Sequence, residues 1–178
     1  HSFLRSHFFW RKHFQKSSIV EFFFLISGFL ITYLLLREKS YTGTIHIGSF
    51  YLRRALRIWP LYFFVILISP FWFHYLNKSL PDYKWLVTFT SNYEVIYKHQ
   101  WTSGLGHFWS IAIEEHFYLI WPVLILFVPF KRIPVLLTAI ISLSILFRIF
   151  VGIYSQEMVN HVRLNTLARM DALAIGGV

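Results

Sequence analysis

The chain has 178 residues, of which 56% are hydrophobic, 21% are aromatic and only 14% are charged. A soluble domain carries about 25% charged residues, so this composition excludes an ordinary soluble domain and predicts a membrane protein. The net charge is +9, but the basic residues fall between apolar segments and do not form the continuous stripe that binds nucleic acid. The absence of cysteine excludes disulfides, thiolate metal sites and cysteine nucleophiles.

Four apolar segments predict membrane-spanning helices. The first, residues 19–36, would be ~27 Å long as a helix, which is enough to cross the hydrocarbon core of a bilayer. The others are expected at about 58–76, 107–128 and 134–154. The fold class predicted is therefore all-α, a polytopic transmembrane helix bundle.

The connections between these segments predict an orientation. Residues 37–57 are expected to form a loop with five basic residues and one acidic residue, and such loops lie in the cytoplasm. Lys131 and Arg132 mark the cytoplasmic side again. Residues 85–97 are apolar but too short to cross, which predicts a re-entrant or interfacial segment. Because the chain begins without methionine and ends in an apolar run, we expect further membrane helices before and after it.

Two adjacent carboxylates, Glu114 and Glu115, lie in the middle of the third predicted span. Each costs roughly 2.5–3.5 kcal/mol at the bilayer centre on insertion scales, so each needs a partner or a function. On a helix, His107, Ser110 and Tyr118 share the face of Glu114, whereas Glu115 lies about 100° away. We expect this polar face to point into the bundle or into a water-filled cavity.

Two interpretations of the glutamates remain open. Each could pair with an Arg or His of another helix and stabilise packing. Alternatively, one could act as a general base or orient a catalytic histidine, while the other forms a structural salt bridge. The candidate cationic partners are Arg57, Arg148 and Arg169.

Arg53, Arg54 and Arg57 lie within about one helical turn. They could anchor the helix on the cytoplasmic side. They could also bind the phosphates of a nucleotide-bearing cosubstrate such as an acyl-CoA, because guanidinium groups bind phosphate in a bidentate manner.

Two further features have structural and functional interpretations. Ser27 and Gly28, within the first span, allow the close approach of another helix or of a ligand, with helix packing the first expectation, and do not form a G-x-S-x-G nucleophile elbow. Arg169 and Asp171 are either capping and interface charges or residues that reach the same cavity as the glutamates. The nine histidines have no metal-ligand spacing, so no metal site is predicted.

Four motifs, in this order along the chain, resemble those of one family, the bacterial integral-membrane acyltransferases of the acyltransferase-3 type, which include glycan O-acetylases. The motifs are FFFLISGFLIT, FYLRRALRIWPLYF, HFWSIAIEEHFYLIWP and RMDALAIGG. The resemblance implies that residues 1–178 are part of a single transmembrane acyltransferase domain, truncated at both ends. Two departures are His116, where the family commonly has Gln, and Glu21, before the first motif.

The resemblance also implies an activity, a location and a set of site residues. The reaction expected is transfer of an acyl group, with acetyl as the first expectation, from a cytoplasmic acyl-CoA cosubstrate to a hydroxyl of a cell-envelope glycan. No bound cofactor is expected, and the location implied is the bacterial cytoplasmic (inner) membrane, with the lipid bilayer, acyl donor and glycan or lipid-linked saccharide as partners. In this scheme His1 is the base or transient acyl carrier, Glu115 with Glu114 assists it, and Arg53, Arg54 and Arg57 bind the donor. The residues expected to line the reaction chamber are Ser27, Trp109, Ser110, Tyr118, Arg169 and Asp171.

Two other functions remain alternatives. A membrane transporter or flippase would use the intramembrane charges to line a substrate path, and a sensor or scaffold bundle would use them only for packing.

Overall fold

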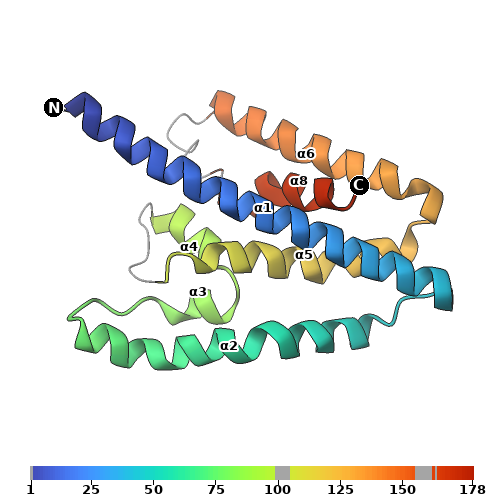
Figure 1. Ribbon diagram of the computed structural model, residues 1–178, viewed down its shortest axis with the longest axis horizontal. Coiled ribbons are helices and arrows are strands. Elements are labelled where there is room, and N and C mark those ends of the chain that lie inside the picture. Colours follow the sequence, from blue (N-terminus) through green and yellow to red (C-terminus); the bar gives the residue numbers. More distant parts are fainter. Residues whose placement is uncertain (1, 99–104, 155–161, 163) are drawn as a thin grey trace.

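The computed structural model describes residues 2–98, 105–154, 162 and 164–178 (Figure 1). Every regular element in these ranges is a helix, which confirms the predicted all-α class. The elements are α1 Ser2–Thr42, α2 Ile47–Tyr75, α3 Tyr83–Val87, α4 Ser91–Lys98, α5 Phe108–Phe127, the 3₁₀ helix η1 Phe130–Arg132, α6 Ile133–Tyr154 and α8 Thr166–Gly176.

Four helical segments are long and apolar enough to cross a membrane, as the composition predicts. They are Ile19–Thr42, Ile47–Tyr75, Phe108–Phe127 and Phe130–Ile153. The chain is therefore a multi-pass membrane protein. Residues 85–97 contain parts of α3 and α4, and neither of these helices is long enough to cross a bilayer.

The predicted loop over residues 37–57 is wrong in its extent. Helix α1 continues to Thr42 and α2 begins at Ile47, so the connection is limited to residues 43–46. Gly43 adopts φ of 75° and donates its N–H to the carbonyl of Lys39 at 3.0 Å, which is how glycine commonly ends a helix. Basic residues do not prevent helix formation, because Arg and Leu are good helix formers. The arginine motif therefore lies on the first turns of α2.

Helix α5 lies between α2 on one side and α1 with α8 on the other (Figure 1). It contacts α1, α2, α4 and α8, while α8 packs between α1 and α6. Because α5 carries both glutamates, the helices packed around it determine which side chains contact each carboxylate.

The packing of α1 against α8 is very close at Gly28. A Cβ atom added there would overlap the backbone carbonyl of Leu173, and one added at Gly176 would overlap the carbonyl of Leu25. Small residues permit this backbone contact between helices in membranes. The close approach predicted from Ser27 and Gly28 is confirmed.

Lys39 joins α1 to the C-terminal end of α5 through hydrogen bonds. Its Nζ donates to the carbonyls of Ile125, Leu126 and Val128 at 2.6, 2.9 and 2.8 Å. The last carbonyls of a helix have no intrahelical donor, and a cation there also interacts favourably with the helix dipole. This residue belonged to the predicted loop, and its role depends on the extension of α1 beyond residue 36.

Replacing Lys39 with Met is expected to lower the free energy of unfolding by about 1–3 kcal/mol, because carbonyls at the end of α5 lose their donor. The thermal midpoint of the purified full-length protein in detergent micelles measures this effect. Lys131→Met is the matched control, since Lys131 is exposed at the same end of α5. Equal midpoints for the two variants would contradict the assigned role.

Candidate active site

Three consecutive residues of α5, Glu114, Glu115 and His116, point to different neighbours. Successive helical residues differ by about 100° in direction, so Glu114 and His116 lie on nearly opposite sides. Glu114 contacts Tyr118 on its own helix, Glu115 lies beside α2, and His116 contacts α8. The polar residues of α5 therefore form separate environments and not one stripe.

Glu114 ends a hydrogen-bond chain that joins α5 to α1. The hydroxyl of Tyr118 donates to Oε2 of Glu114 at 3.0 Å, and the same hydroxyl is hydrogen-bonded to Oγ of Ser27. Since the proton of Tyr118 goes to the carboxylate, Ser27 donates to the tyrosine oxygen. The sequence places Glu114 and Tyr118 on one face, but only the packing of α1 adds Ser27.

Arg54 brings positive charge to this chain from α2. Its guanidinium lies 5.5 Å from the centroid of the Tyr118 ring and 5.7 Å from that of Phe50. The half-buried guanidinium attracts both Glu114 and Glu115 electrostatically. A cation near two carboxylates lowers the cost of placing them in a membrane bundle.

The other two arginines of the motif point elsewhere. Arg53 and Arg57 are exposed, and Arg53 lies 3.5 Å from the Glu38 carboxylate. These two residues are about 40° apart around the helix, whereas Arg54 is about 100° from Arg53. Of the three arginines, only Arg54 lies near the carboxylates of α5, while Arg53 and Arg57 form an exposed pair at the end of the bundle.

The cationic partners predicted for the glutamates are wrong. Arg148 instead lies 2.5 Å from Asp171, and Arg169 lies 2.6 Å from Glu21. Arg57 is exposed on α2, and it is Arg54 that attracts the glutamates. Spacing along the chain shows that arginines are available, but it does not show which face of α2 turns toward α5.

Glu115 retains an unused acceptor. Its Oε1 is buried and has no hydrogen-bond partner among the residues that the structure describes, while Trp59 and Arg54 lie close to its carboxylate. A buried polar atom without a partner costs about 1–3 kcal/mol, so it calls for a ligand, a proton or a further residue. His1, the candidate base, lies outside the described residues, and its pairing with Glu115 stays a prediction.

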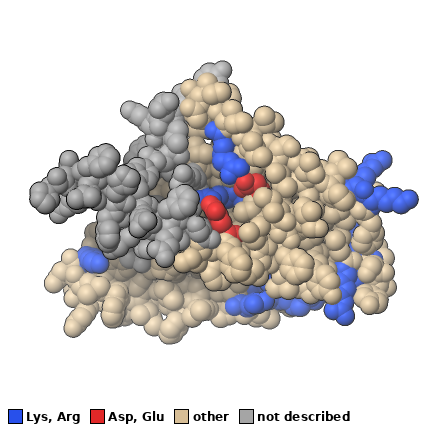
Figure 2. All heavy atoms as spheres, turned by 45° about the horizontal axis from the view of Figure 1, so that its top comes forward, with Lys and Arg blue, Asp and Glu red and all other residues tan. Residues whose placement is uncertain are grey.

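Arg169 and Asp171 form ion pairs that join α8 to the neighbouring helices. Arg169 is buried and pairs with Glu21 of α1, and Asp171 pairs with Arg148 of α6. In Figure 2, acidic side chains lie next to basic ones in the middle of the face, and further basic side chains lie toward its edges. The interpretation of Arg169 and Asp171 as interface charges is supported by these contacts. Glu21 was not among the predicted ion-pair partners, although a lone acid at the start of an apolar span is a usable signal.

Two other residues expected in the chamber make local contacts. Trp109 is half-buried and meets Phe24 edge-on, with ring centroids 6.4 Å apart. Ser110 donates to the carbonyl of His107 at 3.0 Å, one turn back at the start of its own helix. These contacts do not connect either residue to the Ser27–Tyr118–Glu114 chain.

Replacing Tyr118 with Phe is expected to destabilise the protein by about 1–3 kcal/mol, because the half-buried Glu114 carboxylate loses its donor. Ser27→Ala is expected to have a smaller effect, since Tyr118 can still donate to Glu114. The measurement is the thermal midpoint of the full-length protein in micelles. Tyr33→Phe is the control, because Tyr33 is 50% exposed, and a larger effect for Ser27→Ala than for Tyr118→Phe would refute the order of the chain.

Comparison with known proteins identifies the family. A family model described as an acyltransferase domain, of the acyltransferase-3 type, matches residues 2–164. The peptidoglycan O-acetyltransferase OatA of Listeria monocytogenes is 32% identical over 148 residues, which cover 75% of this chain and 24% of that protein. The O-acetyltransferase OatA of Staphylococcus aureus is 35% identical over 119 residues, which cover 61% of this chain and 20% of that protein.

This chain thus spans about a quarter or less of the length of these relatives. No solved structure gives a significant match. The family model covers most of the chain and contains three of the four motifs recognised in the sequence, while the fourth, RMDALAIGG, lies just after the matched residues. The chain belongs to the acyltransferase-3 family.

Proposed function

We propose that this chain is part of a single transmembrane O-acyltransferase domain in the bacterial cytoplasmic membrane. The domain moves an acyl group, in the first instance acetyl, from a cytoplasmic acyl-CoA donor to a hydroxyl of a cell-envelope glycan. The observation that carries the proposal is the Ser27–Tyr118–Glu114 chain with Arg54 beside it, inside a domain of the acyltransferase-3 family.

The arrangement supports acyl transfer because that reaction needs both a base and a group that balances developing negative charge. Arg54 is a fixed cation next to the Tyr118 ring. Glu115 has an acceptor oxygen available to take or orient a proton. His1 is the proposed base or transient acyl carrier, with Glu115 as the residue that orients it.

The exposed arginines support a donor site at one end of the bundle. Arg53 and Arg57 lie on the same face of the first turns of α2, where a pair of guanidinium groups can hold phosphates. Arg54, between them in sequence, turns inward and would link the bound donor to the carboxylates. Lys131 and Arg132 follow α5 at this end, which the positive-inside rule assigns to the cytoplasm.

The relatives support the acceptor class. The Listeria monocytogenes relative is named as a peptidoglycan O-acetyltransferase, and the Staphylococcus aureus relative as an O-acetyltransferase. We therefore take a cell-envelope glycan, with peptidoglycan as the first to test, as the acceptor.

The experiment uses the full-length protein in a strain deleted for its gene and quantifies alkali-labile acyl esters on the envelope glycan. Glu115→Gln, Arg54→Met and His1→Ala are each expected to lower the esters at least tenfold at matched membrane levels, because each removes a proposed acid–base or charge-balancing group. Arg132→Met, an exposed residue outside the proposed site, serves as the control and should retain the esters.

Two outcomes would overturn parts of this proposal. Wild-type ester levels in the three variants would support the acyltransferase activity and contradict the proposed site residues. A complete absence of esters from the wild-type protein would discard acyl transfer to that glycan and favour transport of a substrate along the charged residues.

A further inference from the structure

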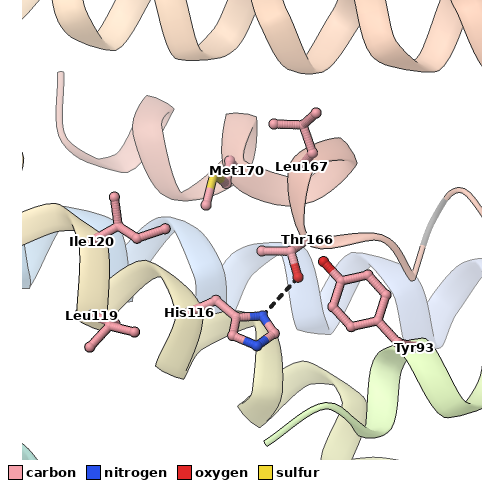
Figure 3. A pocket seen from close by; sticks show the side chains of 7 residues that line it. All are labelled: Tyr93, His116, Leu119, Ile120, Thr166, Leu167 and Met170. Atoms are coloured by element: carbon pink, nitrogen blue, oxygen red, sulfur yellow. Dashed lines mark hydrogen bonds between the residues drawn. The ribbon is translucent and has the colours of Figure 1, made fainter.

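The side of α5 that faces away from Glu114 borders a cavity of about 290 Å³, open between α4, α5 and α8 (Figure 3). Its polar lining consists of Tyr93, His116 and Thr166, and four aliphatic side chains complete it. The Ser27–Tyr118–Glu114 chain contributes no residue to this lining. The cavity is therefore separate from the candidate active site, although His116 directly follows Glu115.

A buried asparagine determines how Thr166 is oriented. Asn92 is fully buried, and its Nδ2 donates to the carbonyl of Leu164 and to Oγ1 of Thr166, both at 3.1 Å. A carbonyl can only accept, so the amide nitrogen of Asn92 must be the atom that faces Leu164. Thr166 consequently accepts a hydrogen bond from Asn92 and keeps its own hydroxyl hydrogen for another partner.

That partner is His116, whose Nδ1 lies 2.8 Å from Oγ1 of Thr166. We assign the Thr166 hydroxyl as the donor and Nδ1 as the acceptor, which puts the proton of the neutral imidazole on Nε2. Figure 3 shows the second ring nitrogen turned away from Thr166. His116 thus offers an N–H donor to a ligand, which suits recognition of an oxygen atom and not removal of a proton from a hydroxyl.

The cavity has no charged lining residue. The nearest acid in sequence to Tyr93 is Glu94, which is buried and paired with Lys98 at 2.7 Å, an interaction that raises the pKa of Lys98. Phosphate or carboxylate groups would find no cation in the lining. Ligand pockets usually measure about 300–1,000 Å³, so this cavity takes one ring-sized group and is too small for a whole nucleotide cosubstrate.

The remaining features fit a sugar ring. Tyr93 and His116 place two rings 5.9 Å apart at an angle of 39°, with the Tyr93 hydroxyl drawn on the same side as Thr166 (Figure 3). Aromatic side chains of this kind combine an apolar face with a polar tip. A neutral sugar can place its C–H face on such a ring while its oxygens accept from His116 and Tyr93.

We propose that this cavity binds a neutral sugar ring of the acceptor glycan, with the Nε2–H of His116 and the hydroxyl of Tyr93 donating to its oxygens. This inference rests on the proposed function for its acceptor class. The bound ring is a neighbour of the ring that reacts, since a glycan chain is long enough to occupy a binding position beside the reaction position. His116 and Tyr93 are binding residues, and Asn92 and Thr166 are positioning residues.

The test measures binding directly, by saturation-transfer difference NMR with the N-acetylglucosamine tetrasaccharide and the full-length protein in nanodiscs. His116→Phe is expected to weaken binding at least tenfold, because phenylalanine has no donor. His116→Gln is expected to stay within about threefold of wild type, because an amide can accept from Thr166 and donate to the sugar. Tyr97→Phe, at an exposed position of α4, is the control and should bind normally.

Folding of each variant is checked by its thermal midpoint, and Tyr93→Phe provides a second variant if His116→Phe does not fold. Unchanged binding in the variant that folds, or no binding by the wild-type protein, would overturn the proposal. The ester assay separates this result from the proposed function. If esters form but the tetrasaccharide does not bind, the sugar site is wrong and the acyltransferase activity stands. If the tetrasaccharide binds but no esters form, the sugar site stands and the proposed acyl transfer is wrong.

Discussion

The structure depends on satisfying the carboxylates of α5 inside a membrane bundle, where water is not freely available to solvate them. A charge in such a place needs partners from other helices. Tyr118 and Ser27 bring α1 to Glu114, and Arg54 brings the first turns of α2 to both glutamates. Polar contacts therefore join α1 and α2 to α5, in addition to the apolar core that these helices share.

Helix α8 is held by two kinds of contact that reinforce each other. Gly28 lets its backbone touch α1, and the pairs of Arg169 with Glu21 and of Asp171 with Arg148 join it to α1 and α6. Removing one partner of such a pair takes a favourable contact away from a charge in the bundle, so the pairs favour this position of α8. Because α8 begins at Thr166, the same contacts also position the hydroxyl that orients His116.

The two sides of α5 differ in their chemistry. Toward α1 and α2, the carboxylates and Arg54 form a charged environment with one unused acceptor on Glu115. Toward α4 and α8, His116 and Tyr93 line an uncharged cavity. A single helix thus separates a region suited to moving protons and balancing charge from one suited to holding a neutral group. The two regions lie close together because adjacent residues of a helix point in directions about 100° apart.

The sequence by itself determines the membrane class, the number and approximate position of the spans, and the family, because these follow from apolar length, charge distribution and ordered motifs. It also places Glu114 and Tyr118 on one face, since that relation is local to a helix. It does not show that residues 37–57 are mostly helical, that Arg54 and not Arg57 meets the glutamates, or that Lys39 caps α5. Those outcomes depend on how α1 and α2 are rotated and how far they extend. The same is true of the cavity beside His116, whose lining comes from three helices that only tertiary packing brings together.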